Sequence, residues 1–293
     1  MKASTSIIGI VVAMALSLVI VLAGSHQGIE RAGLPLFAWI AVIIFAIQWV
    51  VFIPSWFAHS EHFFDLTGSV TYLVVVVACL SSLDSIEPRS LLIGAMVSIW
   101  ALRLGWFLST RVRAVGSDSR FDVMKHRFAW FLMTWTLQGL WILVTSGAAV
   151  AAMSQPGQAS IGPTVLLGAT LWATGFAIEV AADSQKRRFR SKVENHDCFI
   201  TTGLWAYSRH PNYFGEIVLW VGVAVAAIPA LSRWGYATLV SPFFVWALLT
   251  RISGIPLLET AADRRWSGQE DYETYKAHTP TLVFRPGRFH RVG

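Results

Sequence analysis

Charged residues are scarce in this 293-residue chain: Asp, Glu, Lys and Arg together make up only 14% of it. Hydrophobic residues make up 55%, and the mean hydropathy is +0.55. Soluble domains carry about a quarter of charged residues, so this composition excludes an ordinary soluble protein. It indicates an integral membrane protein.

The chain also lacks the patterns of a disulfide scaffold, a metal centre or a nucleotide-binding loop. Its two cysteines, Cys79 and Cys198, fall in an apolar run and in a polar segment, so we expect no disulfide between them. His59 and His62 are too few for a structural zinc site. The glycines between residues 162 and 175 lie in an apolar run rather than after a strand, which excludes a soluble dinucleotide-binding fold.

Long apolar runs are what the chain has instead. Each is close to the roughly 20 residues that cross the hydrocarbon of a bilayer. They lie near residues 5–24, 34–57, 66–83, 90–110, 128–153, 161–182, 213–230 and 235–255. The count is seven or eight, because Pro229 and the short link at 231–234 leave little room for a turn before the last run. The sequence therefore predicts an all-α, polytopic transmembrane helix bundle.

We expect residues 1–293 to form a single membrane domain, with the bundle over 5–255 and a cytoplasmic surface helix and tail over 256–293. The first apolar run is too long for the core of a usual signal peptide, so we expect a retained helix. Residues 256–293 begin with a charged stretch that predicts one or two amphipathic helices on the membrane surface.

The distribution of cations predicts the orientation. If the N-terminus is cytoplasmic, all but four of the 23 Lys and Arg lie on the cytoplasmic side; Arg31, Arg89 and Arg233 lie in outer loops and Arg103 within a span. Cytoplasmic loops of membrane proteins carry such an excess. We therefore expect both termini in the cytoplasm, in a bacterial inner membrane. The net charge of +6 then reflects orientation and contacts with membrane lipids, so no nucleic-acid partner is expected.

The densest group of polar side chains begins at the end of the sixth span. Asp183, Lys186 or Arg187, and Arg190 follow Glu179 at steps of three or four residues, so they share one face of a helix. They can bind an anionic ligand or form a solvated ladder of ion pairs, and the spacing does not decide between the two. The neighbouring cations Arg188 and Lys192 are interpreted as membrane-surface charges.

The next polar run is Ser208-Arg209-His210-Pro211-Asn212-Tyr213-Phe214-Gly215-Glu216. The proline predicts that a helix begins at residue 211 or 212. Asn212, Tyr213 and the free amides of the first turn would then face the cytoplasmic cavity, where they favour phosphate. Glu216 lies one turn deeper, and an acid in a first turn is also favoured simply by the helix dipole.

Two charged residues stand alone among apolar neighbours. Arg103 either extends its head group to the membrane surface or faces the bundle interior and contacts an anion, and the cost of an intramembrane cation favours the second interpretation. Asp65 follows Phe63 and Phe64. It is either a helix N-cap or a protonated carboxyl at the rim of an apolar cavity that donates a hydrogen bond to a ligand carbonyl.

The run from Gly203 to Glu216 resembles the signature of the steroid 5α-reductase C-terminal superfamily, and most closely its bacterial branch of membrane proteins. The resemblance covers most of residues 60–285, including Asp65, Trp100-Ala-Leu-Arg-Leu-Gly105, Gln138-Gly139 and the ending Glu259…Tyr272…Tyr275…Thr279-Pro280. Sterol reductases have the Arg-His-Pro core, and isoprenylcysteine carboxyl methyltransferases have a closely similar motif.

The resemblance implies that NADPH binds among the cytoplasmic halves of the helices, and it implies roles for individual residues. Asp65 falls about where the family has a glutamate that holds the steroid 3-keto group. The family's partner tyrosine is missing, since its place is near Ile99 or Trp100, and Tyr72 is the candidate substitute. Asp65 and Tyr72 are thus the catalytic candidates. The cofactor-binding candidates are Arg103, Asp183, Lys186, Arg187, Arg190, Tyr207, Arg209, His210, Asn212, Tyr213, Glu216 and Glu259.

The leading hypothesis is a membrane-embedded, NADPH-dependent oxidoreductase that acts on a CH–CH group of a lipophilic, steroid-like or other enone or alkene substrate drawn from the bilayer. The first alternative is a methyltransferase that uses S-adenosylmethionine. That cofactor carries no phosphate, whereas the chain offers Lys186, Arg187, Arg190 and Arg209. The second alternative is a non-catalytic lipid-binding or transport protein.

Overall fold

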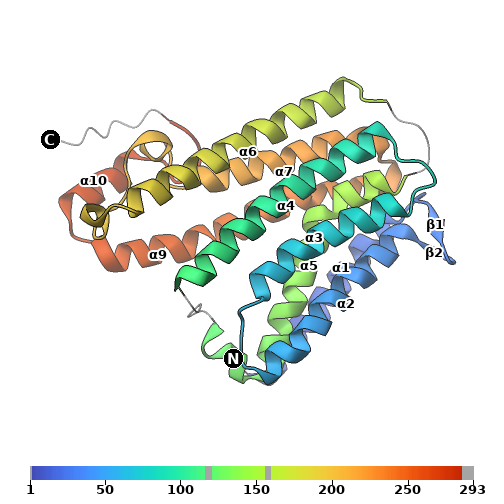
Figure 1. The fold of residues 1–293 in the computed structure, drawn as a ribbon, viewed down its shortest axis with the longest axis horizontal. Coiled ribbons are helices and arrows are strands. Elements are labelled where there is room, and N and C mark those ends of the chain that lie inside the picture. Colours follow the sequence, from blue (N-terminus) through green and yellow to red (C-terminus); the bar gives the residue numbers. More distant parts are fainter. Residues whose placement is uncertain (1, 116–120, 156–159, 286–293) are drawn as a thin grey trace. The chain divides into compact units, whose positions relative to one another are not determined.

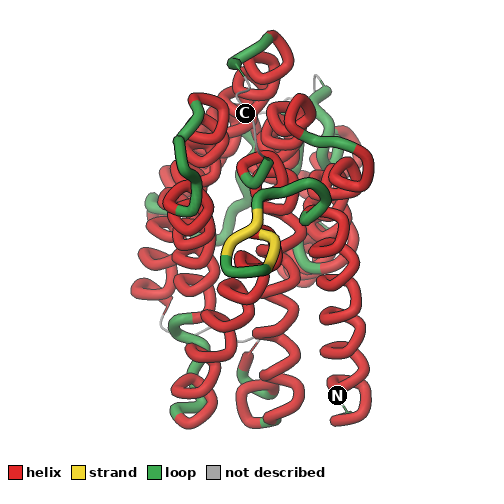
Figure 2. Tube along the Cα trace, turned by 90° about the vertical axis from the view of Figure 1, so that its right-hand side faces the viewer, coloured by secondary structure: helices red, strands yellow, loops and turns green. Residues whose placement is uncertain are grey.

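The computed structural model describes residues 2–115, 121–155 and 160–285. The described chain is almost entirely helical, which confirms the all-α prediction (Figures 1 and 2). Its α-helices are α1 (Ala3–Gly24), α2 (Leu36–Phe57), α3 (Phe64–Ser81), α4 (Pro88–Val115), α5 (Phe128–Met153), α6 (Pro163–Arg190), α7 (Pro211–Ala227), α8 (Ser241–Ala247), α9 (Ile255–Trp266) and α10 (Glu270–His278). One short antiparallel hairpin, β1 (Glu30–Arg31) with β2 (Leu34–Pro35), joins α1 to α2.

Eight helical segments of the described chain are long and apolar enough to cross a membrane, in agreement with the upper count. Seven of them match the expected runs to within a few residues, apart from the longer ends of α4 and α6. The helix α6 continues to Arg190, so the polar residues after 182 extend the sixth span rather than follow it.

The eighth span, predicted near residues 235–255, is present but is not one regular helix. This stretch contains a 3₁₀ helix (Arg233–Val240), then α8, then a π-helix (Leu248–Ile252). Pro242 has no backbone N–H, so the hydrogen-bond pattern restarts there as an α-helix. A second break follows at Gly254, and α9 begins at the next residue.

The contacts divide the chain into two compact units. Unit 1 holds residues 1–167 and 223–241, and unit 2 holds residues 168–222 and 242–293. In unit 1, α5 is the central helix: it packs against α1, α2, α3 and α4. Its Phe131 and Trp135 are fully buried in an aromatic cluster with Phe52 and Phe121.

In unit 2, α6 and α7 pack with their backbones in contact. A Cβ atom on Gly215 would lie 2.6 Å from the Gly175 carbonyl oxygen and 2.7 Å from the Glu179 nitrogen. Glycine is therefore required at this crossing because no side chain fits there. The polar end of α6 and the start of α7, which hold most of the candidate site, belong to this unit.

Candidate functional site

The candidate residues at the polar end of α6 differ in their exposure to solvent. Arg187 and Arg190 are exposed, whereas Asp183 and Lys186 are half-buried. The Lys186 ammonium lies 4.6 Å from the centre of the Trp205 ring, which is a cation–π distance. Because α6 is one continuous helix, its geometry places Glu179, Asp183, Lys186 or Arg187, and Arg190 on one face, as the spacing predicts.

The segment that precedes the Arg-His-Pro run is fixed to α6 and α10. It forms a short 3₁₀ helix (Gly203–Ala206), whose Trp205 is 3% exposed. The Trp205 indole N–H donates to the Ala182 carbonyl at 3.1 Å, and the Trp205 carbonyl accepts from the Tyr275 hydroxyl at 2.7 Å. Gln185 accepts from the Leu204 N–H at 2.9 Å. Tyr207, at the end of this segment, is exposed.

The helix α7 begins at Pro211, as the sequence predicts. His210 caps it: its carbonyl accepts from the Phe214 N–H at 3.2 Å, and its own N–H donates to the Ser208 hydroxyl at 3.2 Å. Asn212 and Tyr213 therefore lie in the first turn, where both are half-buried, and Glu216 lies one turn further along, also half-buried.

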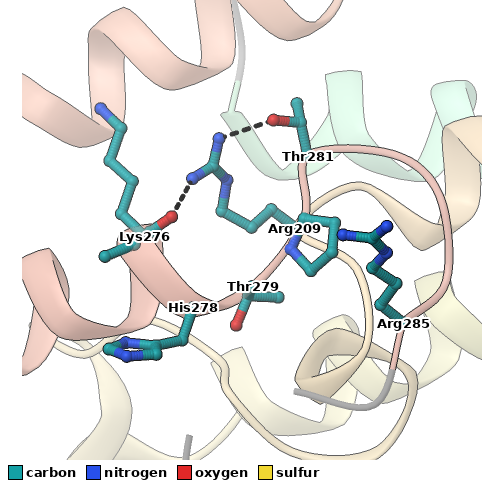
Figure 3. A pocket seen from close by; sticks show the side chains of 8 residues that line it. Arg209, Lys276, His278, Thr279, Thr281 and Arg285 are labelled. Carbon is teal, nitrogen blue, oxygen red and sulfur yellow. Dashed lines mark hydrogen bonds between the residues drawn. The ribbon is translucent and has the colours of Figure 1, made fainter. Parts of the chain in front are cut away.

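Arg209 binds the C-terminal segment at three points. Its backbone N–H donates to the Pro280 carbonyl at 2.9 Å. Its guanidinium donates to the Lys276 carbonyl at 2.7 Å and to the Thr281 hydroxyl at 2.8 Å (Figure 3). The Ser208 hydroxyl adds a bond to the Leu282 carbonyl at 2.9 Å. We call the contacts of residues 208–209 with residues 276–282 the tail latch.

Glu259, on α9, contacts both Arg209 and His210 of the motif. One carboxylate oxygen lies 2.8 Å from the His210 Nε2 atom, and the other lies 3.2 Å from the Arg209 guanidinium. The Lys276 ammonium is 3.8 Å from the same carboxylate and also pairs with Asp263. The sequence singled out Arg209, His210 and Glu259 as separate cofactor contacts; the structure brings them into one hydrogen-bonded group.

The burial of His210 sets its charge. Removal from water lowers the pKa of its ring, and the nearby positive charges of Lys186 and Arg209 lower it further, while the bond to Glu259 partly opposes them. His210 is therefore neutral at neutral pH. The hydroxyls of Tyr272 and Tyr275 stay protonated, because burial raises both pKa values and Asp263 adds to the effect on Tyr272.

A polar cavity of about 520 Å³ lies beside the tail latch. Its walls are residues 276–281 with Arg209 and Arg285, and none of these carries a carboxylate (Figure 3). Sequence analysis did not single out Lys276, Thr281 or Arg285. The only available signal was the ending Thr279-Pro280, which the family resemblance includes.

Three of the candidates belong to unit 1: Asp65, Tyr72 and Arg103. The N-cap interpretation of Asp65 is wrong, because α3 begins at Phe64 and its cap residue is Phe63. Asp65 lies in the first turn and is half-buried. Tyr72 is seven positions further along, so the two lie on nearly the same face of α3, about two turns apart.

The unit 1 candidates differ in burial, and Tyr72 is the most deeply buried of them. Tyr72 is 3% exposed, and its ring packs edge-on against Trp100 with centroids 5.1 Å apart. Gln138 of α5 donates to the Phe64 carbonyl at 3.0 Å and so fixes the start of α3. Arg103, on α4, is half-buried.

Across the described ranges, no three His, Cys, Asp or Glu residues are grouped so that they could hold a metal ion. Cys79 is buried and Cys198 is partly exposed, and both are free thiols.

Together, the apolar helices and the polar group at the start of α7 define an integral membrane protein with a candidate site of cationic and hydrogen-bonding side chains. The chain belongs to the family described as protein of unknown function (DUF1295), whose model matches residues 49–279. This family is part of the steroid 5α-reductase-like superfamily, as the resemblance of the motif implied.

Individual relatives match shorter parts of the chain. The 3-oxo-5-alpha-steroid 4-dehydrogenase 1 of Bos taurus is 35% identical over 75 residues, which are 26% of this chain and 29% of the relative. The protein of the same name from Homo sapiens is 32% identical over 88 residues, 30% and 32% of the two chains. The probable O-methyltransferase ustE of Ustilaginoidea virens is 25% identical over 158 residues, 47% and 54% of the two chains.

The matched part is thus about a third of the length of the two steroid dehydrogenases and about half that of the methyltransferase. No solved structure matches the chain.

Proposed function

We propose that the protein is a membrane-embedded, NADPH-dependent reductase of a lipophilic substrate that carries a carbon–carbon double bond next to a carbonyl. The observation that carries the proposal is the similarity to two 3-oxo-5-alpha-steroid 4-dehydrogenases within the family's superfamily. Dehydrogenation beside a 3-oxo group, written in reverse, is the reduction of a double bond conjugated to that carbonyl. The eight apolar helices supply the surroundings that a lipophilic substrate requires.

The residue types at the end of α6 fit a phosphate-bearing cofactor. Lys186, Arg187 and Arg190 supply positive charge within two turns of one helix, and cationic side chains bind phosphate well. Asn212, in the first turn of α7, adds a neutral donor suited to the same ligand. NADPH bound by these residues would supply the hydride.

Residues of the chain itself would stabilise the reacting carbonyl of the substrate. Asp65, held in the first turn of α3, would donate a hydrogen bond to the substrate carbonyl and so stabilise the negative charge that develops on its oxygen. Tyr72 is the second candidate donor because it lies on the same face of α3. The Trp100 ring, which packs against Tyr72, would help to exclude water from the reacting carbonyl.

Binding of the cofactor is the first test. Purified protein in detergent is titrated with NADPH and with S-adenosylmethionine, and the melting temperature is followed. We expect a concentration-dependent rise with NADPH, because a ligand that binds only the folded state stabilises it. A rise with S-adenosylmethionine and none with NADPH would overturn the proposal.

The second candidate function is a methyltransferase that uses S-adenosylmethionine. The similarity to the probable O-methyltransferase ustE favours it, since that match covers a larger share of the chain than the steroid dehydrogenase matches do. The exposed cations Arg187 and Arg190 favour the reductase, because S-adenosylmethionine has no phosphate for them to bind.

Activity on a lipid extract separates these two functions. NADPH oxidation is measured beside the transfer of a labelled methyl group. We expect NADPH oxidation alone; methyl transfer alone would establish the second candidate. If neither activity is detected and lipid is bound to the purified protein, the result would point to the non-catalytic alternative.

A further inference from the structure

Most polar atoms of the Arg209 side chain bind other residues of the same chain. Its guanidinium donates to the Lys276 carbonyl and the Thr281 hydroxyl and pairs with Glu259. The remaining Nε–H is buried, without a hydrogen-bond partner among the described residues. The two guanidinium bonds to residues 276 and 281 are part of the tail latch.

His210 binds the rest of the described chain through only one of its two ring nitrogens. Its Nε2 atom lies 2.8 Å from Glu259, but its Nδ1 atom has no hydrogen-bond partner within the described part of the chain. The residue is only 6% exposed, so water does not readily satisfy that atom. An unsatisfied polar atom in a buried ring is unfavourable and calls for an explanation.

The Glu259 carboxylate determines which ring nitrogen of His210 carries the proton. An ionised carboxylate beside Arg209 and Lys276 can only accept hydrogen bonds, so Nε2 must be the protonated nitrogen. The ring is neutral, as its burial and the nearby charges require. Nδ1 is therefore left with a free lone pair. The ring of Tyr213 stacks on the imidazole, with centroids 5.8 Å apart.

We propose that Glu259 is a positioning residue that fixes His210 in the Nε2–H tautomer, so that Nδ1 accepts a hydrogen bond from the adenosine part of the bound cofactor. Ribose hydroxyls and the adenine amino group are the donors of that class. The inference rests on the proposed function in so far as that cofactor is NADPH. S-adenosylmethionine carries the same adenosine group, so the role of His210 is the same in both candidate functions.

Two conservative substitutions of His210 separate the two ring nitrogens. In His210→Gln the side-chain amide reaches the Nε2 position and keeps a donor for Glu259, but the Nδ1 acceptor is lost. In His210→Asn the amide oxygen can take the Nδ1 position, but the contact with Glu259 is lost. We expect His210→Gln to keep the wild-type melting temperature and to bind NADPH roughly tenfold more weakly, the scale of one hydrogen bond.

His210→Asn should show the reverse, with a lower melting temperature and NADPH affinity closer to wild type than that of His210→Gln. Wild-type affinity in a folded His210→Gln protein would overturn the role of Nδ1. If wild-type protein binds S-adenosylmethionine or adenosine but not NADPH, the proposed reductase function is wrong. The role of His210 is then tested by titrating the two His210 variants with the ligand that binds. Binding of none of the three overturns the adenosine role.

Nuclear magnetic resonance of protein with ¹⁵N-labelled histidine reads the tautomer without any ligand. The His210 signals are identified by their absence in His210→Gln. We expect a protonated Nε2 and an unprotonated Nδ1 in wild type, and a mixture of tautomers in Glu259→Ala. A protonated Nδ1 in wild type would overturn the positioning role of Glu259, whatever the result of the NADPH titration.

Discussion

Arg188 and Arg190 form a matched pair at the end of α6, because both are exposed and two residues apart, on opposite faces of the helix. If Arg190 binds a phosphate of NADPH, Arg190→Ala should weaken NADPH binding by about 1.5–3 kcal/mol, the scale of a charged hydrogen bond. Arg188→Ala should change it little. Titration of both variants in detergent measures the difference, and equal losses would indicate diffuse electrostatics instead of a specific contact.

Asp65 is the residue on which the proposed reduction depends. Asp65→Ala removes the hydrogen-bond donor and should lose most of the turnover, whereas Asp65→Asn keeps a donor of similar size and should retain part of it. Both variants should still bind NADPH, since the cationic candidates lie on other elements. If the folded fraction of Asp65→Ala turns over at the wild-type rate, Asp65 is not the donor, and Tyr72 is next to be tested.

His210 should make the stability of the protein depend on pH. Its pKa is lowered below the ordinary value of 6.5, so the unfolded chain takes up this proton more readily than the folded protein. The stability that results is fully present above the unfolded value and is lost as the pH falls through the lowered, folded value. We expect the melting temperature of wild type to fall more than that of His210→Gln between about pH 7 and pH 5. Parallel curves would contradict this assignment.

At the scale of helices, the packing of α6 on α7 depends on glycines. A Cβ atom on Gly222 would meet the backbone of Trp172 and lie 2.6 Å from the Gly168 carbonyl oxygen. Backbone cannot yield as a side chain can, so Gly222→Ala should lower the free energy of unfolding by about 1–3 kcal/mol through overpacking.

Gly147→Ala is the matched control for Gly222→Ala. Gly147 lies within α5, and its added Cβ would find only ordinary contacts, 3.8 Å from Ile20 and 3.9 Å from Thr238. Because alanine favours a helix interior, this variant should be as stable as wild type or more so. Thermal unfolding in detergent measures both variants. Equal melting temperatures would show that the α6–α7 crossing is looser than these distances indicate.

At the scale of the whole molecule, the orientation predicted from the cations can be tested with the native cysteines. Cys198 is partly exposed, and the positive-inside pattern places it in the cytoplasm, whereas Cys79 is fully buried. We expect a membrane-impermeant maleimide to label Cys198 in inverted vesicles and not in intact cells, and a Cys198→Ser control to remain unlabelled in both. Labelling of Cys198 from the outside would reverse the proposed topology.

The membrane spans were predictable because each depends on local sequence. A bilayer offers no hydrogen bonds to the backbone, so a long apolar run must become a helix. The start of α7 was equally local, since Pro211 fixes the backbone of the first helical residue. Residues 235–255 show the limit of such patterns: apolarity marked the span, but Pro242 and the π-helix after it divide the segment in a way that hydropathy does not reveal.

The candidate site was predictable as a set of residues but not as an arrangement. The sequence by itself determined that Arg209, His210 and Glu259 belong to a family motif, because residue types at fixed spacing carry that signal. Only the tertiary structure decided that one carboxylate binds both Arg209 and His210, and that the guanidinium also holds residues 276–281. These contacts join positions about 50 to 70 residues apart in sequence. Local propensity cannot encode such contacts, because they depend on how α7, α9 and α10 pack together in unit 2.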